Sequence, residues 1–80
     1  MNWIKPSIHP TGFQGAEVVF ISETHLLARW NHSECRGWQI YARCSTRARS
    51  QTRWIAGAGV ESLTWTEEEA LRWAEQQIAV

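Results

Sequence analysis

The sequence predicts an α+β fold in which a meander of three to four antiparallel strands carries one C-terminal helix on one face. Between residues 17 and 60, several segments alternate apolar and polar side chains with a period of two, which is typical of an antiparallel sheet with one buried face. Residues 66–79 instead repeat with a helical period behind a clear helix start. We therefore expect a single domain that spans all 80 residues.

Residues 1–16 are predicted to form an irregular arm, because they contain both prolines and two of the five glycines of the chain. We expect Trp3, Ile4 and Phe13 to hold this arm against the sheet. A β-branched run follows in residues 17–22 and predicts the first strand.

Further strands are predicted where the alternation resumes, over residues 24–31, 38–44 and 53–56. A turn at 32–37 and a polar loop at 45–51 would join them. In these strands, one set of large apolar side chains is expected to face the helix and form the core. Its members are Leu26, Trp30, Trp38, Ile40 and Trp54.

The C-terminal helix has the strongest start signal in the chain. Thr66 can accept a hydrogen bond from the N–H of Glu69, and Glu69 can accept one from the N–H of Thr66, an arrangement called a capping box. Three glutamates in this first turn also suit the positive end of the helix dipole. Residues 61–65 precede the cap, and the sequence leaves open whether they form a fifth short strand or a lead-in to the helix.

Basic and acidic residues are segregated along the chain. Through Val60 there are seven lysines and arginines against three glutamates, a balance of +4, whereas from Glu61 onward one arginine faces five glutamates, a balance of −4. The formal net charge of zero therefore hides a dipolar molecule. A positive patch of this kind pre-orients an anionic partner.

No arrangement of residues points to catalysis, to a metal site or to a cofactor. His25, His32, Cys35 and Cys44 are zinc-ligand types, but the predicted hairpin places His32 and Cys35 at its turn and the other two roughly 20 Å away at its far end. The same separation argues against a disulfide between the two cysteines. No nucleophile has an adjacent base and a third orienting group, and no phosphate-binding loop pattern occurs. We therefore expect a protein without enzymatic activity, metal or cofactor.

The composition also indicates the cellular compartment of the protein. No run of residues approaches the ~18 apolar positions of a membrane span, and the first residues do not resemble a signal peptide. Two cysteines are too few for a secreted disulfide framework. We expect a small soluble domain in the cytoplasm that does not contact a membrane.

The sheet face opposite the predicted helix carries the candidate binding residues. The alternation places arginines on this face beside polar, aromatic and aliphatic neighbours, and an arginine-bearing loop extends it. The candidate partner-binding residues are Arg29, Gln39, Tyr41, Arg43, Arg47, Arg49 and Arg53. Four of these arginines lie between residues 43 and 53 with no acidic residue among them, which favours a surface for phosphates or for an acidic protein. A basic face that is merely solvated is the alternative.

Several runs in the second half of the chain match a known pattern: Gly-Trp-Gln-Ile-Tyr-Ala-Arg at 37–43, a basic turn, Arg-Trp-Ile at 53–55, and the helix start within 63–70. With these runs, residues 36–76 resemble the three-strand-plus-helix DNA-binding domains of the AP2 and integrase arm-binding type. In those families the sheet lies in the major groove, so the resemblance implies DNA contacts for Arg43, Tyr41 and Arg53. The chain departs from them in an insertion at 57–62 and in an additional strand before residue 36.

Two functions from different classes follow from these features. The first is a protein-binding inhibitor or adaptor, and in its small size the chain is similar to the accessory proteins of phages and mobile elements, including anti-CRISPR proteins. The zero net charge favours this function, because dedicated nucleic-acid-binding domains are usually basic overall. The second is a small nucleic-acid-binding domain that uses the same arginines. The oligomeric state stays open, and self-association through a sheet edge is a further alternative.

Overall fold

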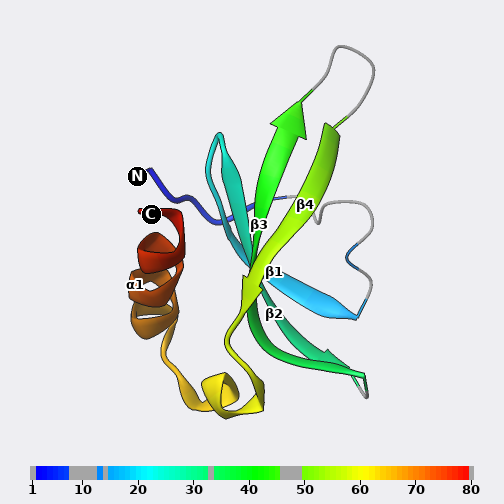
Figure 1. The fold of residues 1–80 in the computed structure, drawn as a ribbon, viewed down its shortest axis with the longest axis vertical. Helices are drawn as coiled ribbons and strands as arrows, with labels where there is room; N and C mark the ends of the chain where they lie inside the picture. The colour runs from blue at the N-terminus through cyan, green and yellow to red at the C-terminus, as the bar shows by residue number, and fades with distance from the viewer. Residues whose placement is uncertain (1, 8–12, 14, 33, 46–49, 80) are drawn as a thin grey trace.

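A computed structural model of the chain describes residues 2–7, 13, 15–32, 34–45 and 50–79. Within these residues, four antiparallel strands form one sheet in chain order, and a helix packs on one face of it (Figure 1). The elements are β1 (Ala16–Ile21), β2 (His25–His32), β3 (Cys35–Ser45), β4 (Ser50–Gly57), the 3₁₀ helix η1 (Val60–Thr64) and the helix α1 (Glu67–Ile78). The predicted α+β meander with one C-terminal helix is confirmed.

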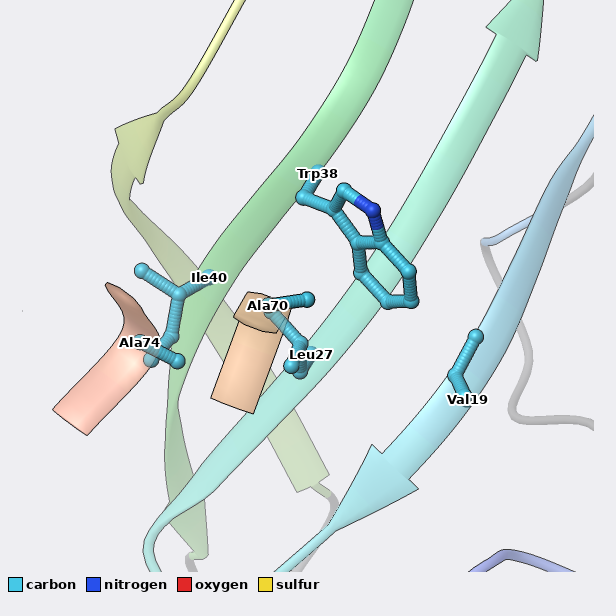
Figure 2. Close-up of a cluster of buried hydrophobic side chains, with 6 residues drawn as sticks. All are labelled: Val19, Leu27, Trp38, Ile40, Ala70 and Ala74. Carbon is cyan, nitrogen blue, oxygen red and sulfur yellow. The ribbon is translucent and has the colours of Figure 1, made fainter. Parts of the chain in front are cut away.

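The side of the sheet that faces α1 holds a continuous core. Trp38 of β3 and Leu27 of β2 are fully buried, together with Ala70 and Ala74 of α1. Figure 2 shows the Trp38 indole reaching from β3 across β2 toward Val19 of β1. Alanines on the helix allow a close approach to the sheet, so the indole is packed on all sides. Full burial of a large apolar side chain stabilises the fold by about 1.5–3 kcal/mol.

The opposite face of the sheet carries a second buried cluster. Leu26 and Ala28 of β2 and Val18 of β1 are buried there together with Phe13, which comes from the N-terminal segment. Tyr41 packs at the border of this cluster. The expectation that the helix-free face is open is therefore wrong over β1 and β2, because Phe13 covers it. The same face is more exposed farther along β3 and β4.

The pairing of β2 with β3 corrects the predicted orientation of β2. Only two residues separate the strands, and the resulting register pairs Leu27 with Ile40. Leu27 therefore faces α1, whereas Leu26 and Trp30, which the alternation predicts on the helix side, lie on the opposite face. The pattern could not decide this, because both faces of β2 are apolar and the length of the hairpin loop sets the register.

A β-bulge at Ile55 corrects the predicted orientation of Trp54. Tyr41 pairs with Trp54 and Ile40 pairs with Ala56, so Ile55 is an additional residue in β4. Ile55 and Ala56 both pack toward α1, and Trp54 lies on the opposite face beside Tyr41. A strict period of two predicts Trp54 on the helix side, and the inserted residue breaks that period.

The structure decides between the alternatives for residues 61–65, which lie mostly in η1 rather than in a strand. This 3₁₀ helix crosses β3 closely at Gly37, where φ is +105° and an added Cβ would lie 2.0 Å from the carbonyl oxygen of Gly59. The buried Ser62 hydroxyl accepts a hydrogen bond from the N–H of Trp38 at 2.9 Å and donates one to the Gly59 carbonyl at 2.6 Å. These bonds fix η1, and thus the start of α1, against β3.

The predicted capping box at the start of α1 is confirmed. The Thr66 hydroxyl accepts a hydrogen bond from the N–H of Glu69 at 3.2 Å, and the Glu69 carboxylate accepts one from the N–H of Thr66 at 2.9 Å. In the described part of the chain, neither helix has the length and apolar character needed to cross a membrane.

The N-terminal arm is partly regular. Ile4 and Ile21 exchange two backbone hydrogen bonds of 2.8 Å, so the arm lies along the outer edge of β1. Trp3 packs against the helix-side core, and Lys5 pairs with Glu67 of α1 at 2.8 Å. The arm is therefore held by its backbone and by Trp3, whereas the Ile4 side chain remains 60% exposed.

Candidate protein-binding surface

The arginines and polar residues predicted to bind a partner do not share one face of the sheet. Gln39, Tyr41 and Arg43 lie on the face of β3 opposite α1, as the alternation predicts. Arg29 and Arg53 occupy pairing positions on the helix side. The prediction of one continuous basic face is therefore wrong, because the orientation of β2 and the bulge in β4 divide its members between two faces.

Arg29 belongs to the internal structure of the sheet. Its guanidinium donates a hydrogen bond to the carboxylate of Glu17 on the neighbouring strand β1, which makes an ion pair. The same guanidinium lies over the ring of the buried Trp38, 5.3 Å from the ring centroid. The Glu17 carboxylate offsets the charge of Arg29, and the Trp38 ring holds the guanidinium against the sheet, so Arg29 contributes little to the attraction of an anionic partner.

Arg43 lies on the face of β3 opposite α1, just past the position where the first residue of β2, His25, pairs with Ala42. Its Nη1 donates a hydrogen bond to the carbonyl of Ser22 at 2.7 Å, and its backbone N–H donates one to the carbonyl of Thr24 at 2.8 Å. The turn between β1 and β2 therefore fixes the guanidinium, which has five N–H donors in total. Arg43 is exposed, and no described carboxylate pairs with it.

Arg53 lies on the helix side of β4 and is exposed. It has no ion-pair partner within the described residues. Arg47 and Arg49, the other two arginines of the predicted loop, lie outside the described residues. Among the described residues near the loop between β3 and β4, Arg43 on the face opposite α1 and Arg53 on the helix side each lack an ion-pair partner.

Trp54 exposes 55% of its surface, whereas the other five tryptophans are buried or half-buried. Its indole N–H donates a hydrogen bond of 2.6 Å to Oε1 of Gln39, and Nε2 of Gln39 donates one to Sγ of Cys35 at 3.1 Å. This chain of bonds orients the indole on the outer face of the strand. Trp54 is therefore an ordered apolar platform that faces solvent.

Tyr41 supports this platform from the neighbouring strand. Its hydroxyl accepts a hydrogen bond from the indole N–H of Trp30 at 2.9 Å, and its ring meets Phe13 edge-on with centroids 5.0 Å apart. Burial raises the pKa of Tyr41, with a smaller contribution from the nearby Cys35, while the bond from Trp30 opposes the rise. The phenol therefore stays neutral at physiological pH and keeps the aromatic surface uncharged on this side.

These residues form a surface that we name the outer hairpin surface. It consists of the side chains on the face of β3 and β4 opposite α1, namely Gln39, Tyr41, Arg43, Thr52 and Trp54. Tryptophan, tyrosine and arginine are the residues most enriched in the hot spots of protein interfaces, and this surface brings one of each together.

Charge further distinguishes this hairpin from the rest of the chain. Residues 35–57 contain five arginines and no acidic residue. The ion pairs among the described residues lie elsewhere and join Lys5 to Glu67, Arg29 to Glu17 and Arg72 to Glu68. Among the described residues, Arg43 and Arg53 of this hairpin therefore carry charges that no ion pair offsets, beside the exposed Trp54.

The described residues show no grouping of three or more histidine, cysteine or glutamate side chains that could hold a metal ion. His32 pairs in register with Cys35 at the turn of β2 and β3, while His25 lies at the other end of β2. His25 bonds to the hydroxyl of Thr24 at 2.7 Å, and burial lowers its pKa. His25 and Cys35 thus lie at opposite ends of the β2–β3 pair.

A comparison of the chain with protein-family models, curated proteins and solved structures finds no match. The resemblance of residues 36–76 to DNA-binding domains stays a prediction. So does the nature of the partner.

Sequence reasoning missed Trp54, the most exposed member of the surface. One signal in the chain points to it. Trp54, Ile55 and Ala56 are three consecutive apolar residues, which departs from a period of two in the way that an inserted residue does.

Proposed function

We propose that this chain is a small non-enzymatic protein-binding domain, an inhibitor or adaptor that acts in the cytoplasm like the small accessory proteins of phages and mobile elements. Its partner contacts the outer hairpin surface. The exposure of the Trp54 indole carries this proposal, because an ordered tryptophan facing solvent has no structural need in a domain with other tryptophans in its core.

The size of the exposed indole sets the scale of this contact. A tryptophan side chain buries ~200 Å² when it is fully covered, and Trp54 exposes 55% of its surface. Covering the remaining area would contribute about 2–3 kcal/mol at ~25 cal/mol per Å². That is the contribution of an interface anchor, and Tyr41 and Arg43 lie beside it on the same face.

The placement of the arginines favours a protein over a nucleic acid. Binding to a phosphate backbone requires several cations along one face, since affinity grows with the number of phosphates neutralised. Arg29 is paired with Glu17, and Arg43 and Arg53 lie on opposite sides of the sheet. The described surface therefore offers an aromatic anchor with one flanking arginine rather than a basic track.

Nucleic-acid binding is the second candidate function. The observation that favours it is the complete absence of acidic residues from 35–57, which contain five arginines. An exposed tryptophan can also stack on an unpaired base. In this alternative, affinity would fall steeply between roughly 50 and 200 mM salt.

The test is affinity capture from a nuclease-treated lysate of the source cells, with the captured proteins quantified by mass spectrometry. The wild-type chain is compared with Trp54→Ala and with the matched control Val60→Ala, which removes an equally exposed apolar side chain, 54% exposed, from η1. We expect a protein that wild type and Val60→Ala retain and that Trp54→Ala loses by at least roughly tenfold.

Equal capture by all three proteins would contradict the proposal. A parallel titration with duplex and single-stranded DNA and RNA at ~50 and ~150 mM salt distinguishes the second candidate. Binding to nucleic acid that vanishes at the higher salt would move the assignment to that candidate.

A further inference from the structure

This inference rests on the proposed function and names the part of the partner that is recognised. We propose that the partner supplies an extended acidic segment, with acidic and apolar residues in alternation, that adds to the sheet as a fifth strand along β4. The binding mode is strand addition, in which backbone hydrogen bonds provide affinity and alternate side chains provide specificity.

The two edges of the sheet differ in their availability. At the β1 edge, Ile4 already exchanges two backbone hydrogen bonds with Ile21. At the β4 edge, the described part of the chain contributes no strand beyond β4, which pairs only with β3. Alternate N–H and C=O groups of an edge strand point away from its neighbour and can pair with another chain.

The bulge at Ile55 limits the length of the segment that can be added. Up to Trp54, β4 pairs with β3 without interruption, from Ser50 opposite Ser45 to Trp54 opposite Tyr41. Beyond that point the inserted residue bends the strand. The regular edge therefore accommodates a segment of about five residues, which corresponds to a typical strand length.

Side chains at this edge specify the chemistry of the added strand. Arg53 lies on the helix side of β4, and Thr52 and Trp54 lie on the opposite side. Since residues directly opposite in neighbouring strands share a face, the residue opposite Arg53 would be acidic and the residue opposite Trp54 apolar. The result is the alternating acidic and apolar pattern of the proposed segment.

A second copy of the chain is the less favourable occupant of this edge. Pairing two β4 edges would bring together two hairpins that each contain five arginines and no acidic residue over 35–57. Like charges in facing strands are destabilising. An acidic segment of another protein instead removes the unscreened charge of Arg53, which has no ion-pair partner within the described residues.

The test uses the full chain and a blocked hexapeptide that alternates glutamate and valine. Binding is followed by tryptophan fluorescence and by backbone amide shifts in nuclear magnetic resonance, up to ~1 mM peptide, the weak end of specific recognition. We expect saturable binding, with the largest amide shifts in β4 between Ser50 and Trp54. A peptide with the same side chains but methylated on every backbone nitrogen should bind at least roughly tenfold more weakly, because it cannot donate to the edge.

Charge reversal at Arg53 tests the side-chain rule. Arg53→Glu should lose the glutamate peptide and gain binding to the same peptide with lysine in place of glutamate. The matched control Arg72→Glu makes the same change in net charge on an exposed position of α1 and should bind the glutamate peptide as wild type does. Far-ultraviolet circular dichroism confirms that both variants fold.

Three outcomes would overturn strand addition. These are no binding of the glutamate peptide, equal binding of the methylated peptide, or a concentration-dependent dimer of the free chain that Arg53→Glu strengthens. Failure here is distinguishable from failure of the proposed function. If wild type captures a partner that Trp54→Ala loses, and the peptide does not displace that partner, the proposed function stands and only strand addition along β4 is refuted.

Discussion

Trp38 and Trp54 lie on adjacent strands of one sheet and have opposite environments. Trp38, on the helix side of β3, is fully buried among Leu27, Ala70 and Ala74. Trp54, on the opposite side of β4, exposes 55% of its surface. The helix-side face therefore holds the larger core, whereas the hairpin end of the opposite face is open to solvent.

The largest effect is expected from Trp38→Ala. Removing a fully buried tryptophan leaves a cavity between β3 and α1 that the surrounding side chains can fill only in part. We expect a loss of about 3–5 kcal/mol in the free energy of unfolding, measured by urea titration with circular dichroism. A loss below ~1 kcal/mol would show that the helix-side cluster does not form the core.

The next largest effect is expected from Gly37→Ala, at the crossing of β3 and η1. The residue has φ +105°, and its new Cβ would lie 2.0 Å from the Gly59 carbonyl oxygen. We expect a loss of at least about 2 kcal/mol, because both the backbone and the contact are strained. Gly15→Ala is the matched control, since its φ is also positive at +89° but the nearest atom is 3.5 Å away. Equal losses would contradict the close crossing.

A smaller effect is expected from the capping box of α1. Thr66→Ala removes the hydroxyl that accepts from the Glu69 N–H and should cost about 1 kcal/mol in the free energy of unfolding. Urea titration measures the loss at neutral pH. A variant as stable as wild type would show that this cap does not hold the helix start.

The same box predicts a pH dependence. Hydrogen bonds from Thr66 lower the pKa of Glu69, so its stabilising contribution is present above its unfolded pKa and is lost as pH falls through the lower, folded pKa. Wild type should exceed Glu69→Gln in stability at neutral pH, and the difference should vanish in acid. A difference that persists at pH values below the folded pKa would exclude this cause.

The smallest effect on stability is expected from Trp54→Ala. The indole is largely exposed, and its hydrogen bond to Gln39 is replaceable by water. We expect a change within about 0.5 kcal/mol in the free energy of unfolding by the same titration. A larger loss would assign Trp54 to the core and remove the basis of the binding proposal.

The contrast between the two tryptophans also marks how far sequence patterns reach. Capping by Thr66 and Glu69 is local, so the sequence places the start of α1 correctly. The faces of Leu26 and Trp54 depend on a hairpin register and on a bulge, which arise from pairing between strands. Period two alone cannot supply them, because an inserted residue or a different loop length reverses the face.

The candidate site shares this limit. Gln39, Tyr41 and Arg43 are correctly predicted on one face, since β3 alternates without interruption where they lie. The alternation predicts Arg29 on that face as well, but Arg29 pairs with Glu17 on the helix side, a contact between strands that no local pattern encodes.

Two measurements on Trp54→Ala decide whether Trp54 of the outer hairpin surface binds a protein rather than stabilising the fold. The free energy of unfolding and the amount of captured partner would be measured on the same preparation, beside Val60→Ala. We expect Trp54→Ala to keep wild-type stability and lose the partner, and Val60→Ala to keep both. A stable Trp54→Ala protein that retains the partner would contradict it.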